Sequence, residues 1–121
     1  MESFNIESFV KGYHVYRQIW TPIISERLTA VQEPTNLVDK YAVCVLKNGH
    51  VVGHLEKGQT GKFAKTIFYF LRADDESSCV VVIRGKPVNL GSKEGMAVPC
   101  TLEFQGRKDF IDILKRQLSK S

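Results

Sequence analysis

Short stretches rich in Val, Ile, Thr and aromatic residues alternate with Gly, Asn, Pro and Asp along most of the chain. This pattern is typical of the strands and turns of a small antiparallel β domain. It predicts six strands, at 4–16, 28–32, 41–46, 51–55, 79–85 and 96–104. Asn48-Gly49 separates the third strand from the fourth, and both residues tolerate the positive φ angles of a type I′ turn. These two strands should therefore form a hairpin.

A helical period replaces this pattern in two segments. In 61–73 the apolar residues that share one helical face are Phe63, Ile67, Phe70 and Leu71. In 109–119 the corresponding stripe is Phe110, Ile113, Leu114 and Leu118. Both segments therefore predict amphipathic helices, the first of them capped by Thr60. The segment 86–95, rich in Gly, Asn and Lys, is expected to be a loop between the last two strands.

Six strands and two helices in 121 residues are too few for a two-sheet sandwich and too rich in β-structure for a doubly wound fold. We predict a mainly β (α+β) fold, a small OB-like, partly closed six-stranded antiparallel barrel with two helices. The length fits a single domain, 1–121. Barrels of this kind commonly bind single strands or oligosaccharides.

The net charge of +4 is unevenly distributed along the chain. Segments 40–73 and 107–121 carry net charges of +5 and +3, whereas segments 1–39 and 74–106 each carry −2. Cations near the end of the last helix are also expected of a solvated helix face. The first basic segment is therefore the better candidate for contact with an anionic partner.

Several other classes of protein are disfavoured. No run approaches the ~20 apolar residues that span a bilayer, and the N-terminus lacks the basic residues of a signal peptide. We expect an intracellular chain that does not bind membranes, in the nucleus or the cytoplasm, with the nucleus slightly favoured. The three cysteines lie far apart, as expected of free buried thiols. Because no P-loop, nucleophile elbow or metal-spaced cluster occurs, we expect no enzyme, no cofactor and no metal.

Two segments carry a more specific pattern, EPTNLVDKYAV at 33–43 and VVGHLEK at 51–57. Their order and spacing resemble the HIRAN domain, in which REPxNPYDxNAIxV is followed by a hairpin and VGHLPR. GYHVY at 12–16 is similar to the GxRYY stretch of that family, and VPCTLEFQG at 98–106 to its closing strand. The resemblance covers about 8–118. It implies an OB-like module of DNA-repair proteins that grips the 3′ end of single-stranded DNA.

The resemblance also implies roles for the residues around the terminal nucleotide. Tyr16 would pack against a nucleotide, with His14 beside it. Asp39 would accept a hydrogen bond from the terminal 3′-hydroxyl, and Asn36 would hold the loop that carries Asp39. From the residues alone, Asn36 and Asp39 are also the usual caps of a loop of their own.

Further contacts would surround this pocket. The resemblance implies that His54 and Lys57 contact backbone phosphates and that Phe104 flanks the pocket. Candidate additional phosphate contacts in the basic segment are Lys40, Lys62 and Lys65. Such cations, together with rings that stack on bases, are what single-strand binders use.

The chain departs from the family pattern at the two tyrosines that would sandwich a base, where it has Val15 and Val38. Stacking is worth ~1–3 kcal/mol per base, so this replacement favours weaker DNA binding. His14, Tyr16 and Trp20 are partial substitutes; Trp20 is more simply a core residue.

The leading hypothesis is a monomeric, non-enzymatic module that binds single-stranded DNA at a free 3′-hydroxyl. The alternative is a protein- or peptide-binding domain that uses the same groove, lined by Val15, Leu37 and Val38, without nucleic acid.

Overall fold

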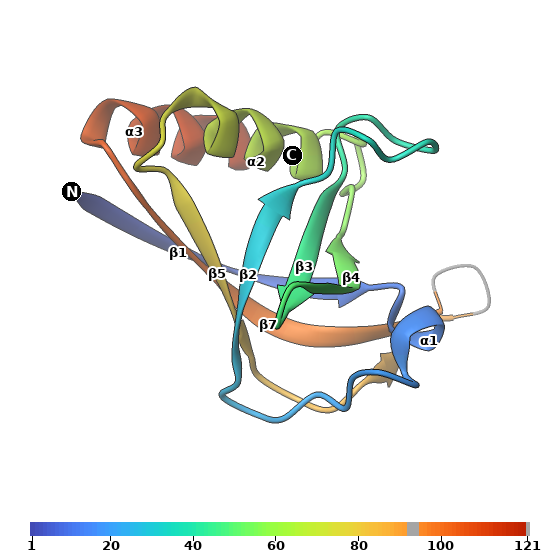
Figure 1. Ribbon diagram of the computed structural model, residues 1–121. Helices are drawn as coiled ribbons and strands as arrows, with labels where there is room; N and C mark the ends of the chain where they lie inside the picture. Colours follow the sequence, from blue (N-terminus) through green and yellow to red (C-terminus); the bar gives the residue numbers. More distant parts are fainter. Residues whose placement is uncertain (92–94, 121) are drawn as a thin grey trace.

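The computed structural model describes residues 1–91 and 95–120, except for the side chain of His14. Its framework is an antiparallel sheet that closes on itself. The strands, in spatial order, are β1 (Glu2–Lys11), β4 (His50–Leu55), β3 (Val43–Lys47), β2 (Arg27–Gln32), β5 (Ser78–Ile83) and β7 (Met96–Gly106). β7 pairs back onto β1 over ten residues, so within the described residues the six strands form a closed barrel (Figure 1). The short strand β6 (Val88–Asn89) adds to β7 from outside.

The predicted OB-like six-stranded barrel is thus confirmed, although it is closed rather than partly closed. Closure leaves the ladder between β1 and β7 continuous from Glu2 opposite Gly106 to Lys11 opposite Ala97. Such closure removes the exposed edges that an open sheet would present. The outer strand β6 lies in a segment predicted to be a loop, and residues 92–94 of that segment lie outside the described residues.

The first strand ends earlier than its sequence pattern predicts. Gly12 follows β1 with φ of 81°, a left-handed conformation that breaks the strand. The next residues form a short helix, α1 (Tyr13–Tyr16), instead of the end of a strand 4–16. This correction moves Tyr16 from a strand onto a helix.

The hairpin at Asn48-Gly49 is confirmed. These residues have φ of 52° and 82°, the positive values that a type I′ turn requires. Residues Lys47 and His50 pair directly beside the turn. The hairpin therefore fixes the register of β4, the strand that carries His54.

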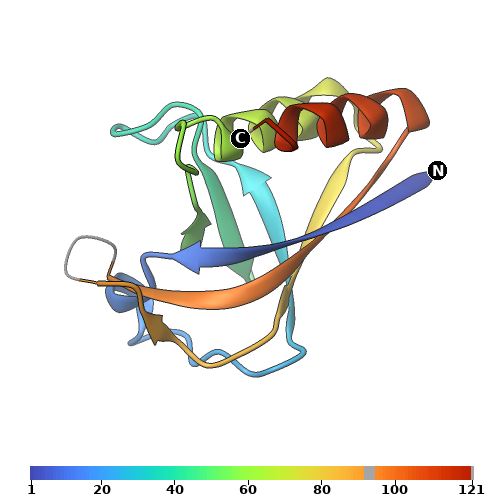
Figure 2. The ribbon, with the colours of Figure 1, turned by 180° about the vertical axis from the view of Figure 1, so that it is seen from behind.

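Two helices, α2 (Phe63–Ala73) and α3 (Lys108–Leu118), lie side by side over one end of the barrel (Figures 1 and 2). Their apolar faces enter the core through Phe63, Ala64, Ile67, Phe68, Phe70, Ile111, Leu114 and Leu118. Ile113 was predicted to be on the core-facing stripe, but its side chain is 45% exposed. Ile111 takes that place, because it lies three and seven residues before Leu114 and Leu118. None of the described helices is long and apolar enough to cross a membrane.

The predicted cap of α2 is wrong. The helix begins at Phe63, after Lys62, and no side chain caps its first turn. The backbone N–H of Phe63 instead donates to the carbonyl of Lys57 at 2.8 Å. This bond fastens the start of α2 to the end of the VVGHLEK segment, so Thr60 has no capping role.

Trp20 and the cysteines are core residues, as predicted. The indole of Trp20 is 2% exposed, and its Nε1 donates to Glu26 at 3.0 Å. The three cysteines are buried and unpaired. These cysteines therefore stabilise the core through packing and form no disulfide bond with one another.

Candidate functional site

The loop between β2 and β3 projects beyond the barrel near the start of α2 (Figure 1). Asn36 organises it: its Oδ1 accepts from the backbone N–H groups of Val38 and Asp39, both at 2.9 Å. The Asp39 carboxylate in turn accepts from the N–H of Tyr41 at 2.9 Å. The loop-capping interpretation of Asn36 and Asp39 is therefore confirmed, and Asp39 is held in place before any ligand arrives.

Glu33 connects this loop to the barrel. Its Oε1 accepts from Asn36 Nδ2 at 2.7 Å and lies 2.8 Å from His54 Nε2. His54 belongs to β4, and the ring of Tyr16 on α1 lies 6.3 Å from the imidazole. The Glu33 carboxylate thus links the loop that carries Asn36 to β4, the strand that carries His54.

Gly53, next to His54, is required by the close approach of β1. A Cβ atom on Gly53 would lie 2.4 Å from Cγ1 of Val10 and 3.0 Å from the carbonyl oxygen of Lys11. At this point β1 pairs with β4, with Lys11 opposite His54. The glycine of the GHL sequence therefore serves the barrel junction that positions the imidazole.

Electrostatics keep Glu33 ionised. Partial burial would raise the pKa of Glu33, but hydrogen bonds from Asn36 and His54 outweigh it and hold the pKa below its usual value. Burial raises the pKa of Tyr16, and the neighbouring charge of Glu33 raises it further. Burial, followed by Glu33, also raises the pKa of the Cys44 thiol to about 11. Tyr16 and Cys44 are therefore neutral beside one fixed negative charge.

Asp39, which is partly buried, forms an ion pair with the exposed Lys57. The ammonium of Lys57 lies 3.8 Å from the Asp39 carboxylate, and the lysine side chain is 62% exposed. Together with Asn36 and His54 they line a pocket of about 160 Å³ whose inner wall includes Ala64. The pocket offers an acceptor and a cation side by side, which suits a hydroxyl with a phosphate nearby.

A wider hollow of about 920 Å³ opens on the other side of His54 and Lys57. Phe9, Lys11 and Glu56 are among the residues that line it. His54 and Lys57 line both cavities. A strand whose end occupies the small pocket can therefore continue either into the wider hollow or away from it.

Not every predicted site residue reaches this region. Phe104 is completely buried, with its ring packed 6.1 Å from Phe4 and 5.7 Å from Phe70. It points into the core from β7, so the prediction that it flanks the pocket is wrong. The side chain of His14 lies outside the described residues.

The two valines that replace the family's tyrosines are exposed, Val15 by 63% and Val38 by 92%. Leu37, next to Val38, is fully exposed at the tip of the loop. Val38 lines the small pocket at Asp39, whereas Val15 and Leu37 are not among the residues that line it.

The additional lysines are divided between two positions. The ammonium groups of Lys40 and Lys65 lie 5.2 Å and 4.6 Å from the centroid of the Tyr41 ring. Lys62 is exposed directly before α2. Glu33 and Tyr41 were not predicted to be site residues, although both stand inside the EPTNLVDKYAV segment.

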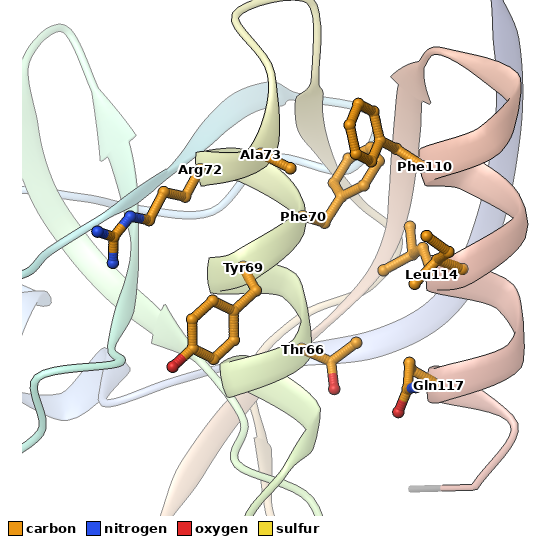
Figure 3. Close-up of a pocket in the computed structure, with 9 residues that line it drawn as sticks. Thr66, Tyr69, Phe70, Arg72, Ala73, Phe110, Leu114 and Gln117 are labelled. Atoms are coloured by element: carbon orange, nitrogen blue, oxygen red, sulfur yellow. The ribbon is translucent and has the colours of Figure 1, made fainter.

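A third cavity, of about 580 Å³, lies between α2 and α3 (Figure 3). Phe70, Ala73, Phe110 and Leu114 form much of its apolar lining. It shares no residue with the pocket at Asp39. Among the described residues, no group of three or more His, Cys, Asp or Glu side chains is placed to hold a metal ion.

No protein-family model matches the sequence, and no curated protein matches it. Solved structures do match. The crystal structure of the HIRAN domain of human HLTF aligns with a TM-score of 0.72 and 23% identity, over 96% of this chain and 87% of that one. An NMR structure of the HLTF HIRAN domain in its DNA-bound conformation aligns with a TM-score of 0.63 and 24% identity, over 96% and 86%. The chain therefore has the OB-like fold of the HIRAN domain.

Proposed function

We propose that this chain is a non-catalytic module that binds single-stranded DNA at a 3′ end with a free hydroxyl. The observation that carries the proposal is the position of Asp39, whose carboxylate is fixed by its own loop beside Lys57 and His54 in a small pocket. The shared fold with the HLTF HIRAN domain, which has a DNA-bound structure, supports nucleic acid as the ligand.

The charges of the pocket suit a terminus better than the middle of a strand. A carboxylate accepts a hydrogen bond from a hydroxyl but repels a phosphate, so Asp39 would distinguish a free 3′ end from a phosphorylated one. Lys57, which is largely exposed, is available to the phosphate that precedes the terminal nucleotide. The net positive charge of the chain favours the approach of DNA.

The affinity should be modest, because the exposed valines provide no stacking surface. Each lost base stack costs ~1–3 kcal/mol, and Val15 and Val38 stand where the family has tyrosines. Tyr16, half-buried beside His54, is the ring that remains next to the pocket.

Fluorescence anisotropy tests the proposal with three ligands: a single strand with a free 3′-hydroxyl, the same strand with a 3′-phosphate, and a blunt duplex. We expect the hydroxyl strand to bind most tightly and the affinity to fall steeply with salt. Equal affinity for all three, or none, would reject 3′-end recognition. Lys57→Ala should weaken every ligand alike, whereas Lys86→Ala, a matched change at an exposed lysine outside the pocket, should weaken none.

A further inference from the structure

A group of cationic and aromatic side chains continues from the pocket onto α2. We call it the Tyr41 cluster; its members are Lys40, Tyr41, Lys65, Tyr69 and Arg72. Lys40 and Tyr41 end the loop that carries Asp39, and the other three belong to α2. Figure 3 shows the side chains of Tyr69 and Arg72 leaving α2 on the side away from α3, although both residues also line the cavity between the two helices.

The ring of Tyr41 is the centre of the cluster. It packs edge-on against Phe68, with ring centroids 5.7 Å apart, and lies 5.6 Å from the ring of Tyr69. The ammonium groups of Lys40 and Lys65 lie within 5.2 Å of its centroid. Attraction between a cation and a π-system thus holds two flexible lysines near one ring.

These cations are not neutralised by the protein. Within the described part of the chain, Lys40, Lys65 and Arg72 form no ion pair with a carboxylate. A hydrogen bond from Tyr69 lowers the pKa of Tyr41, and the charges of Lys40 and Lys65 lower it further. The cluster is therefore a surface of positive potential that an anion would stabilise.

The cluster is continuous with the pocket. Asp39, which lines the pocket, immediately precedes Lys40, and Ala64, which also lines it, immediately precedes Lys65. The hollow on the other side of His54 contains the carboxylate of Glu56 as well as cations. A strand that leaves the pocket across α2 would meet three cations instead.

We propose that the Tyr41 cluster binds the nucleotides that precede the 3′ end, with Lys40 and Lys65 on the backbone phosphates and Tyr69 under a base. Tyr69 is 45% exposed and offers the stacking surface that the exposed valines lack. This inference rests on the proposed function, since it extends the same strand away from the pocket.

The test compares a dinucleotide, whose single phosphate is the one assigned to Lys57, with a single strand of about 12 nucleotides, a length within the range of known single-strand sites. The double variant Lys40→Gln/Lys65→Gln is measured beside Lys86→Gln, which removes one lysine charge outside the cluster. Each single-strand phosphate contact contributes about 0.7 to the slope of log affinity against log salt, so the double variant should flatten the slope by about 1.4. By the same relation its affinity for the long strand should fall about 25-fold at about 0.1 M salt.

The dinucleotide should bind the double variant and the wild type equally, and Lys86→Gln should behave as wild type. Tyr69→Ala should weaken the long strand without changing its salt slope, because stacking releases no counterions. An unchanged slope in the double variant overturns the inference, and so does a loss of long-strand affinity confined to Phe9→Ala, which would place the strand in the hollow. Equal affinity for an oligoglutamate peptide would overturn it in favour of an acidic protein.

The two proposals fail separately. In one outcome the double variant has a flatter salt slope, but wild type binds the hydroxyl and phosphate ends equally. This outcome supports the cluster and rejects 3′-end recognition. A preference for the hydroxyl end with no effect of the double variant rejects the cluster alone.

Discussion

Replacing Gly53 by alanine tests whether the approach of β1 to β4 requires a glycine next to His54. The added Cβ would lie 2.4 Å from Cγ1 of Val10. Val10 is completely buried and β-branched, so its methyl group cannot turn away freely. The clash must be relieved by a shift of the barrel wall.

The magnitude follows from two opposing terms. Alanine would favour the strand over glycine by about 0.5–1 kcal/mol, whereas overpacking a filled core costs about 1–3 kcal/mol or more. Because the contact is far inside the van der Waals distance, we expect Gly53→Ala to lower the free energy of unfolding by about 2 kcal/mol. Val10→Ala, which deletes two buried methyl groups, should lower it by a similar amount, about 2 kcal/mol.

The assay is urea unfolding followed by the fluorescence of Trp20, the sole tryptophan in the chain. In the double variant the clashing methyl is gone, and the Cβ of residue 53 fills part of the space left by Val10. We therefore expect the double variant to lose about 2 kcal/mol, not the roughly 4 kcal/mol of two independent changes. Additivity within about 0.5 kcal/mol, or a stabilising Gly53→Ala, would refute the role assigned to this glycine.

Three further predictions follow from the contacts of the site and core. Glu33→Ala should weaken binding of the 3′-hydroxyl strand and increase amide exchange in the loop, because His54 loses its 2.8 Å partner; unchanged exchange would contradict this. Cys44 should resist alkylation of the native protein at neutral pH, since burial raises its pKa to about 11, and should react after unfolding. Burial would raise the pKa of Glu26, but hydrogen bonds from Lys47 and Trp20 outweigh this effect and lower the pKa. The ionised Glu26 should therefore stabilise the fold above about pH 4.5, and this stabilisation should be lost on acidification. Urea unfolding from neutral to acid pH should show this loss reduced in Glu26→Gln.

Local chemistry made much of the fold predictable. Asn48-Gly49 specifies its turn through positive φ angles, and the loop at Asn36 and Asp39 is closed by hydrogen bonds within a few residues. The end of β1 was not predicted, because residues 13–16 suit a strand and only the left-handed turn at Gly12 redirects them. The signals at Asn48-Gly49 and in the Asn36 loop, in contrast, act within a few residues and are visible in the sequence.

The errors at the site arose from long-range packing. Strand alternation places Phe104 on a face of β7, but does not say that this face is the interior of the barrel. Glu33 is separated from His54 by 21 residues, so their contact depends on β3, which pairs with both β2 and β4. The cluster around Tyr41 likewise requires α2 to pack beside the loop.

The central claim is that Asp39 selects a free 3′-hydroxyl. The most direct measurement is the ratio of the affinities for the hydroxyl and phosphate forms of one single strand, in wild type and in Asp39→Asn. Asparagine keeps the size of the side chain and removes the charge that repels a phosphate. We expect a preference for the hydroxyl strand in wild type and a ratio near one in Asp39→Asn, chiefly through tighter binding of the phosphorylated strand. The same ratio in both proteins would contradict the claim.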